Sequence, residues 1–430
     1  MRYCIKAGEI IDPAGGFVGK GDLLIEAGKI AAVGPELPVE DAIIIDATDK
    51  IVCPGLIDLH SHLREPGRED EETIASGTKA ALKGGFTAVA CMANTTPVAD
   101  TSVVIEYILS RAQQAGWAKV YPVGAITKGL QGVELAEMGE LAAAGAVAFS
   151  DDGKTIMNTA VLRAAMEYSN LFGLPLLLHQ EDPDLAGNGV MHEGYWSMVL
   201  GLPGIPDIAE STVISRDLAL AEFTGAKVHF CHISTAKSVA LLRETKNRGG
   251  VRVTAEVTPH HFSLDDALLQ DYDPVYRVSP PLRSAADLTA VRAGLKDGTI
   301  DAIATDHAPH TREEKHREFA LAPTGMIGFE TALAVAWTRL VEEGWLTKTQ
   351  LVEKLSVNPA RILNCPGGRI QPGDCADVLI FDPRREWTVR EEDLISLSNN
   401  SPFIGMKLRG IVDSVWVNGN LKYANGKFSA

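Results

Sequence analysis

The sequence lacks several features that mark whole classes of protein. No apolar run of 18 residues occurs in it, which argues against a membrane-spanning helix. Its six cysteines are scattered without a CxxC pair, so they indicate free thiols in a reducing compartment and not a disulfide framework or a zinc knuckle. The opening residues, MRYCIKAGEIIDPAGG, contain no apolar h-region of a signal peptide. Together these absences lead us to expect a cytoplasmic enzyme.

Positive charge is in deficit, and nucleotide-binding motifs are missing. The chain carries 40 Lys and Arg against 56 Asp and Glu, for a net charge of −16. This balance argues against nucleic acid or an anionic membrane surface as a partner, and an anionic substrate would need a local basic site. No GxGxxG follows an apolar run and no GxxxxGK[ST] occurs, so nucleotide-binding folds lose their usual support.

Both ends of the chain have the pattern of short strands and hairpins. Residues 1–53 alternate apolar and polar positions around glycine turns, and the same pattern returns in residues 364–430. We predict that the two ends pack together as one small β-sandwich domain beside residues 54–363. A chain of 430 residues has room for a large α/β barrel with such an appendage.

In the middle of the chain, apolar strand-like runs alternate with stretches of helical composition. The eight runs are IVCPGLIDLHSH, TAVACMANT, KVYPVGAI, AVAFSDD, PLLLHQED, KVHFCHIS, VRVTAEVTPHH and IDAIATDHAPH. Such alternation implies parallel strands with right-handed crossovers, and eight units suit a (β/α)8 TIM barrel. An open doubly wound sheet is the competing prediction, because counting units does not prove closure.

Histidine is scarce, with 11 in the chain, so its placement is informative. Polar residues gather where the runs end: His60 and His62, Asn94, Asp151 and Asp152, His179, His232, His260 and His261, and Asp306 with His307 and His310. Each alone has an ordinary explanation as a core histidine, a turn aspartate or a helix cap. In a barrel, however, all these ends share the C-terminal face where active sites are built. The joint pattern therefore predicts one site.

Four histidines and two aspartates of this set predict a metal centre: His60, His62, Asp152, His179, His232 and Asp306. Imidazole and carboxylate suit Zn²⁺ or a similar ion, and six ligands suit two ions that share a bridging carboxylate and hydroxide. We favour Asp152 as the bridge over a carboxylated Lys154, which already lies in the turn. His260 and His261 are expected to support the site without binding metal. The chemistry that follows is hydrolysis at an amide-like carbon, or its reverse.

These motifs together resemble a known family. HSHLREPG, FSDDG, the histidines after LLL and HFC, ATDHAPHTREEK and the later NPAR resemble the amidohydrolase superfamily. Nearly the whole chain is similar to bacterial dihydroorotases of the long, class I type. The resemblance implies zinc-dependent, reversible cyclisation of N-carbamoyl-L-aspartate to L-dihydroorotate in de novo pyrimidine biosynthesis. A homodimer and a complex with aspartate transcarbamoylase are further expectations from the family.

The resemblance also implies a role for each ligand. It makes His60, His62, Asp152 and Asp306 the ligands of one zinc ion, and Asp152, His179 and His232 those of the other. Two Zn²⁺ ions per subunit would then be bridged by Asp152 and a hydroxide. Asp306 would in addition exchange protons with the bridging water and the ring nitrogen of the substrate.

The substrate-binding residues are implied in the same way. Arg64 and Asn94 would hold the substrate carboxylate, with His62 and His310 as further contacts. Arg64 is expected to share the strand face of His60 and His62. The segment EEKHREFALAPTG, residues 313–325, would cover the substrate.

Two departures from the family pattern affect substrate recognition, and two alternatives remain open. Ser279 stands where the family usually has the asparagine of NPPLR, and Thr324 before Gly325 replaces the aromatic residue of APFG. Both positions would contact the substrate ring. A hydantoinase, dihydropyrimidinase or allantoinase is the alternative activity, and Arg64 discriminates against it because those substrates mostly lack a ring carboxylate. An inactive dihydroorotase-like assembly subunit is the alternative from another class.

Overall fold

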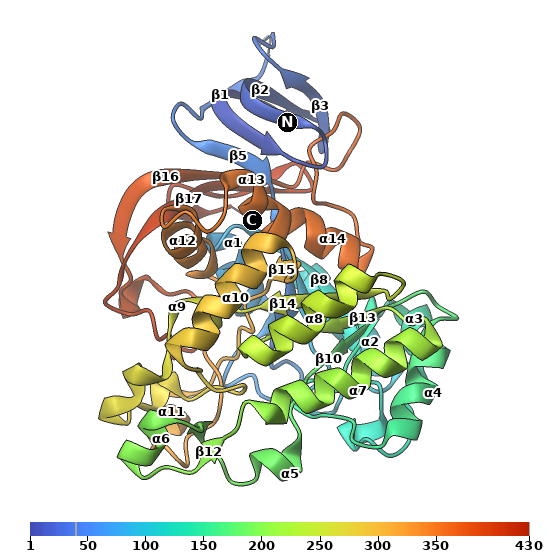
Figure 1. Ribbon diagram of the computed structural model, residues 1–430. Coiled ribbons are helices and arrows are strands. Elements are labelled where there is room, and N and C mark those ends of the chain that lie inside the picture. The colour runs from blue at the N-terminus through green and yellow to red at the C-terminus, as the bar shows by residue number, and fades with distance from the viewer. Residues whose placement is uncertain (39–40, 430) are drawn as a thin grey trace.

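The computed structural model of the chain describes residues 1–38 and 41–429. A ring of parallel strands lies beside a second sheet that is built from both ends of the chain (Figure 1). Within the described residues, no helix is both long and apolar enough to cross a lipid bilayer.

Eight parallel strands form the central barrel, one from each of the eight apolar runs. Their bounds are β6 (Leu56–Ser61), β7 (Phe86–Cys91), β8 (Lys119–Gly124), β9 (Ala148–Phe149), β10 (Leu176–Leu178), β13 (Val228–Phe230), β14 (Val253–Val257) and β15 (Ala302–Ile303). They are hydrogen-bonded in chain order from β6 to β15. Because both faces of such strands are covered, their sequences are nearly continuous apolar runs. The predicted α/β alternation is confirmed.

The first and last strands of the barrel meet, which favours the barrel over the open sheet. Ser61 and His307 form a parallel bridge, and the backbone N–H of His62 donates to the carbonyl of His307 at 2.8 Å. Below them, the carboxylate of Asp58 accepts hydrogen bonds from the backbone N–H of Thr305 at 2.8 Å and from its hydroxyl at 2.6 Å. Closure brings the carboxyl ends of all eight strands to one rim.

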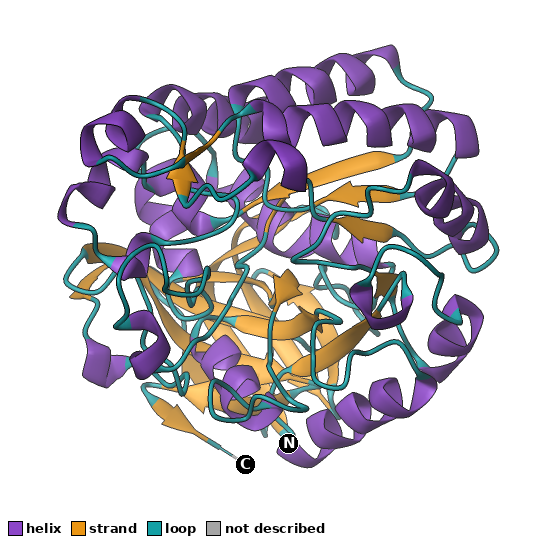
Figure 2. Ribbon diagram, turned by 90° about the horizontal axis from the view of Figure 1, so that it is seen from below, coloured by secondary structure: helices purple, strands orange, loops and turns teal. Residues whose placement is uncertain are grey.

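Helices surround the barrel strands (Figure 2). Their bounds are α1 (Ile74–Lys83), α2 (Ser102–Ala115), α3 (Met138–Ala144), α4 (Thr159–Ser169), α5 (Pro183–Ala186), α6 (Tyr195–Leu200), α7 (Ile208–Thr224), α8 (Ala236–Arg248), α9 (Pro259–Ser263), α10 (Ala285–Asp297), α11 (Arg312–Lys315), α12 (Ala332–Ala336), α13 (Lys348–Val352) and α14 (Asn358–Leu363). Side-chain caps fix several helix starts. Thr73 and Ser76, for example, form a capping box at α1.

Shorter elements complete the loops. The 3₁₀ turns are η1 (Lys128–Leu130), η2 (Asp266–Asp271), η3 (Pro274–Tyr276) and η6 (Glu391–Asp393), and the π turns are η4 (Trp337–Val341) and η5 (Glu353–Val357). Strands β11 (Met191–His192) and β12 (Gly204–Ile205) pair with each other in the long connection after β10.

The two ends of the chain form one sheet, as the sequence predicts. Its strands are β1 (Arg2–Asp12), β2 (Phe17–Glu26), β3 (Lys29–Gly34), β4 (Ile43–Asp46), β5 (Ile51–Pro54), β16 (Val378–Thr388), β17 (Lys407–Val417), β18 (Asn420–Ala424) and β19 (Lys427–Phe428). The junction is the antiparallel pairing of β5 with β16, which joins the blue and red ends of the chain in Figure 1. This sheet of the two chain ends has an apolar core of its own, which includes Ile10, Ile25, Val378 and Trp416.

Candidate metal centre and substrate cavity

The six residues predicted as metal ligands converge at the carboxyl rim of the barrel. His60 lies within β6 and His62 follows that strand directly, while Asp152, His179, His232 and Asp306 follow β9, β10, β13 and β15. All six are buried. Two of them, His232 and Asp306, have φ angles of +36° and +46°, in the left-handed region that non-glycine residues rarely adopt. Such strain is common where a fold holds functional side chains in place.

The ligand atoms form two overlapping groups around Asp152. One oxygen of Asp152 lies 3.2 Å from Nε2 of His60, and the other lies 3.4 Å from Nε2 of His232 and 3.7 Å from Nδ1 of His179. Asp306 Oδ1 lies 3.0 Å from Nε2 of His62 and 3.5 Å from Nε2 of His60. The six side chains thus supply one set of donors from His60, His62 and Asp306 and another from Asp152, His179 and His232.

The nitrogen and oxygen atoms of the cluster are better suited to binding a cation than to hydrogen-bonding with one another. His60 Nε2 and Asp152 Oδ1 are buried and have no hydrogen-bond partner among the described residues. Buried polar atoms without partners are costly, and a coordinated ion removes that cost. Nitrogen and carboxylate donors within 4.8 Å of one another are the set that Zn²⁺ and similar ions prefer.

The electrostatics of the cluster lead to the same conclusion. Burial lowers the pKa of His60, but the carboxylates of Asp152 and Asp306 oppose this and raise it well above its ordinary value. Burial raises the pKa of Asp152, yet His60, His179 and His232 together lower it well below its usual range. The carboxylates are therefore anionic, and the site attracts positive charge. A divalent ion would supply that charge without protonating the rings.

Hydrogen bonds on the far side of two rings direct their Nε2 atoms toward the carboxylates of the cluster, where a metal could bind. Nδ1 of His62 lies 2.9 Å from Oδ1 of Asn94, and Nδ1 of His60 lies 2.9 Å from Oε1 of Glu256. Both oxygens are acceptors, so each ring carries its proton on Nδ1 and presents the lone pair of Nε2 to the cluster. Glu256 was not predicted from the sequence, because its place in the apolar strand β14 gave no signal.

A cavity of about 360 Å³ opens above the cluster. All the predicted site residues except His60 line it: His62, Arg64, Asn94, Asp152, His179, His232, Ser279, Asp306, His310, Thr324 and Gly325. His60 lies beneath it and is fully buried. The structure thus brings the predicted metal ligands and the predicted substrate contacts to one place.

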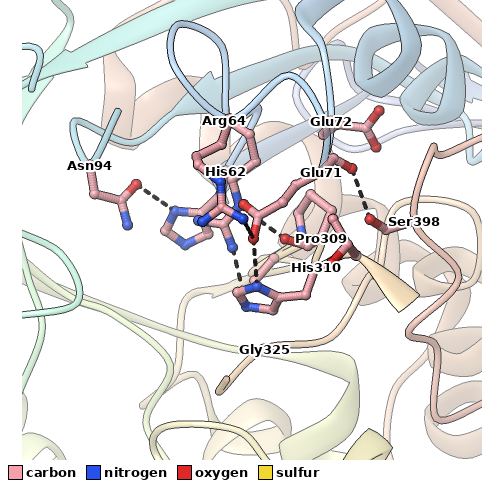
Figure 3. A network of polar contacts seen from close by, with 12 residues as sticks. His62, Arg64, Glu71, Glu72, Asn94, Pro309, His310, Gly325 and Ser398 are labelled. Carbon is pink, nitrogen blue, oxygen red and sulfur yellow. Dashed lines mark hydrogen bonds and ion pairs between the residues drawn. The ribbon is translucent and has the colours of Figure 1, made fainter. Parts of the chain in front are cut away.

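Arg64 reaches the cavity by a different route from the one the sequence suggested. Strand β6 ends at Ser61, so Arg64 lies in the following loop with a φ angle of +59°, and the expectation that it shares the strand face of His60 and His62 was wrong. Its Nε donates to the carbonyl of Pro309 at 3.0 Å, and its Nη2 lies 3.4 Å from Nε2 of His310 (Figure 3). An anionic substrate would need a local positive charge in this acidic protein. The guanidinium of Arg64 can supply it, and the loop after β15 holds that group in place.

The remaining predicted contacts surround the same cavity. Ser279 donates a long hydrogen bond of 3.4 Å to Glu181, and Nε2 of His310 lies 2.9 Å from the carbonyl of Thr324. Gly325 has a φ angle of +142°, and a Cβ atom there would approach Nε2 of His310 to 2.9 Å. A side chain at this position would therefore crowd the imidazole.

Two charged residues of the cavity and one buried thiol were not predicted from the sequence. Glu181 and Arg277 line the cavity, but they lie in loops without a metal-like spacing. Arg277 Nη1 donates to the carbonyls of Phe319, at 3.0 Å, and Ala322, and so holds the segment predicted to cover the substrate. Cys231 lies near His60 and Asp152, but burial raises the pKa of its thiol, which keeps it protonated and a poor ligand.

His260 and His261 lie in α9, beside the site. Nε2 of His261 lies 2.9 Å from the carbonyl of Pro280, next to Ser279, and its Nδ1 lies 2.7 Å from the hydroxyl of Thr258. Burial lowers the pKa of His260 to about 4, so that ring is neutral. Neither residue belongs to a group of potential metal ligands among the described residues.

Comparison with known proteins agrees with the resemblance seen in the motifs. The family described as Dihydro-orotase-like matches residues 49–238. A dihydroorotase of Pelotomaculum thermopropionicum is 52% identical over 421 residues, which cover 98% of each chain. A dihydroorotase of Syntrophus aciditrophicus is 49% identical over 425 residues, covering 98% of this chain and 99% of the relative.

Solved structures share the fold at lower identity. The L-hydantoinase (dihydropyrimidinase) of Arthrobacter aurescens superimposes with a TM-score of 0.89 at 24% identity, covering 100% of this chain and 97% of the other. The D-hydantoinase (dihydropyrimidinase) of Thermus sp. has a TM-score of 0.81 at 26% identity, with 99% and 96% covered. These likenesses support the barrel with its flanking sheet. From the near full-length identity to the dihydroorotases, the chain belongs to the dihydroorotase family.

Proposed function

We propose that this enzyme interconverts L-dihydroorotate and N-carbamoyl-L-aspartate, a step of de novo pyrimidine biosynthesis. The observation that carries the proposal is the combination of a metal-ligand cluster and a partly buried arginine around one cavity. The cluster suits hydrolysis of a cyclic amide, and Arg64 suits a substrate that bears a carboxylate. Family membership supports the same reaction.

We assign two zinc ions to the cluster. His60, His62, Asp152 and Asp306 would hold one ion, and Asp152, His179 and His232 the other, with Asp152 and a hydroxide as bridges. Bound zinc would acidify a water molecule to near-neutral pH and polarise the scissile carbonyl. The central position of Asp152, whose two oxygens face different histidines, supports its bridging role.

Asp306 is the proposed catalytic acid and base. Its carboxylate lines the cavity, and burial, which raises its pKa, is outweighed by His60 and His62, which lower the pKa below its ordinary value. The group is therefore ionised at neutral pH and ready to accept a proton from the attacking water. In the hydrolytic direction it would then deliver that proton to the ring nitrogen as the amide bond breaks.

Arg64, Asn94 and His310 form the proposed carboxylate-binding group. Since Oδ1 of Asn94 accepts the proton of His62, its amide N–H groups remain to donate to an anion. Ser279, Thr324 and Gly325 would contact the substrate ring, and His62 would be a further contact of the substrate. Residues 313–325, held by Arg277, would cover the bound substrate.

Metal analysis coupled to a ring-opening assay tests the proposal. Purified protein should contain close to two zinc ions per chain and should hydrolyse L-dihydroorotate. Less than one bound metal, with no ring opening after zinc is added, would overturn it. Ring opening of dihydrouracil or a hydantoin in preference to L-dihydroorotate would instead identify a hydantoinase-like activity, and full metal occupancy without turnover of any ring would identify an assembly subunit.

The remaining proposals concern organisation and context. We propose domain boundaries at residues 1–53, 54–363 and 364–430, a cytoplasmic location, and a homodimer able to associate with aspartate transcarbamoylase. Light scattering of the purified protein, alone and mixed with that enzyme, tests the last two assignments.

A further inference from the structure

A buried carboxylate, that of Glu71, contacts two of the three residues that are proposed to bind the substrate carboxylate, Arg64 and His310 (Figure 3). Its side chain is 2% exposed and comes from the loop between β6 and α1. Oε2 lies 2.9 Å from Nε of Arg64, and Oε1 lies 2.8 Å from Nδ1 of His310. Arg64 and His310 follow the first and last strands of the barrel, so Glu71 joins two loops that are far apart in sequence.

Glu71 constrains Arg64 on the side away from the cavity. Burial lowers the pKa of Arg64, and the charge of Glu71 is the largest influence that opposes it. The contacts of the guanidinium with Glu71 and with the carbonyl of Pro309 both use Nε. A guanidinium held at Nε leaves its Nη groups to donate to an anion, and here Nη2 also lies 3.4 Å from Nε2 of His310.

Glu71 also determines how His310 presents its ring. An ionised carboxylate only accepts hydrogen bonds, so Nδ1 of His310 must carry a proton. Nε2 lies 3.4 Å from Nη2 of Arg64 and 2.9 Å from the carbonyl of Thr324, which also only accepts, so a ring that donates to both acceptors carries a proton on each nitrogen. The other charged groups at this place are Arg68, whose Nη2 lies 3.2 Å from Glu71, and Glu314, which pairs with Arg68 at 2.8 Å.

The loop that carries Glu71 is itself anchored by the C-terminal part of the chain. The hydroxyl of Ser398 donates to the carbonyl of Glu71 at 2.8 Å, and the hydroxyl of Ser396 donates to Glu72 at 2.5 Å. Asn400, two residues after Ser398, donates to the carbonyl of Ala308, two residues before His310, and to the carbonyl of Gly325. The carboxylate is therefore fixed before substrate arrives.

We propose that Glu71 is a positioning residue for substrate recognition, whose carboxylate orients Arg64 and His310 as a preformed receptor for the carboxylate of the substrate. The inference rests on the proposed function. It adds a residue that would touch neither metal nor substrate and would act through Arg64 and His310, two of the three side chains proposed to bind the anion. Preorganisation of this kind raises affinity by removing the cost of ordering the receptor on binding.

Glu71→Gln is the direct test, because it keeps the shape and removes the charge. The amide accepts from only one of its two partners, so either Arg64 or His310 loses its anchor. We expect KM for L-dihydroorotate to rise about tenfold or more, with kcat within about threefold and zinc content unchanged. Asp70→Asn is the matched control, since it removes a neighbouring exposed carboxylate that pairs with Arg68 and should leave KM within about twofold.

Several outcomes would overturn the inference. The first is a folded Glu71→Gln variant whose KM equals that of the control variant Asp70→Asn. The second is a Glu71→Gln variant that loses kcat and bound zinc together. If Glu71→Gln fails to fold, Glu71→Asp keeps the charge but shortens its reach. A wild-type KM in that variant, or failure to fold as well, would show a structural residue and not a positioning one.

A measurement without substrate separates this inference from the proposed activity. The ring nitrogens of His310 can be observed by ¹⁵N NMR in the zinc-loaded protein, with His310→Asn used for assignment. Wild type should show a protonated Nδ1, and Glu71→Gln should shift the tautomer or its titration. An unchanged ring would reject the role of Glu71 whether or not the enzyme opens dihydroorotate, and a wild type that opens no dihydroorotate would reject only the proposed function.

Discussion

Nδ1 of His60 lies 2.9 Å from Oε1 of Glu256, a carboxylate that is completely buried. The other oxygen of Glu256 lies 3.0 Å from Nε2 of His229, whose Nδ1 lies 2.8 Å from the hydroxyl of Thr254. Burial raises the pKa of Glu256, but His229 and His60 lower it to about 2, so the group is anionic. The proposed metal ligand His60 is therefore fixed in one tautomer by a charged neighbour, and His229 contacts the same carboxylate from the other side.

Glu256→Gln should weaken metal binding. The amide keeps the size of the side chain but loses the charge that makes the ring of His60 a better donor. Zinc affinity, measured by competition with a chelator, should fall about 10- to 100-fold. Glu330→Gln, at another buried glutamate outside the cavity, controls for burial and should leave zinc affinity unchanged. Equal affinities of Glu256→Gln and wild type would contradict the assignment.

Arg64→Ala should separate recognition of the carboxylate from chemistry. Loss of a charge-assisted, bidentate contact should raise KM for L-dihydroorotate by about two orders of magnitude and should leave kcat much less affected. Arg64→Lys should recover only part of the loss, because an ammonium cannot match the planar fork. Steady-state kinetics on L-dihydroorotate and on the neutral ring dihydrouracil provide the measurement. An equal loss on both rings would mean that Arg64 does not read the carboxylate.

Asp306→Asn should abolish most turnover. The amide has no basic oxygen of comparable strength, so proton exchange with water and the ring nitrogen would be lost and kcat should fall by about 10²- to 10⁴-fold. Because Asp306 is also a proposed ligand, kcat should be compared at equal zinc content, measured on the same samples. Intact turnover at full zinc occupancy would remove Asp306 from the acid and base role.

Asp217 should make the free energy of unfolding depend on pH in the acidic range. Burial raises its pKa from 3.8 to about 6, although Arg216, at 2.7 Å, opposes the shift. Between these values the folded state binds more protons than the unfolded state, so stability should fall as pH rises through this window, by at most about 1.4 kcal/mol per pH unit. Denaturant unfolding of wild type and Asp217→Asn between pH 4 and 7 tests this. The difference in stability between the two proteins should be flat above pH 7, and a flat difference throughout would exclude the raised pKa.

Much of the fold could be predicted because it is encoded in local pattern. Each barrel strand is an apolar run, and each is covered on both faces, so the runs were visible without any knowledge of their neighbours. The six candidate ligands were visible for a related reason. Each lies at or just after the end of such a run, and the parallel topology brings the ends of the runs together.

The supporting groups could not be predicted in this way. Glu256 lies inside a strand, Glu71 in a polar loop, and Asn400 in the C-terminal segment, and none has a spacing that indicates its partner. Arg64 illustrates the same limit. Its residue type suggested the function, but the position of its side chain follows from where β6 ends and from the loop after β15.

The sequence by itself determined the order of strands and helices, the chemical character of the rim and the family. Only the tertiary structure decided that the barrel closes, which ring nitrogen of His60 and His62 faces the cluster, and which carboxylate stands behind Arg64 and His310. The physical reason is that periodicity and residue type act over a few neighbouring positions. Hydrogen bonds between loops depend instead on the three-dimensional path that places residues such as 71 and 310 side by side.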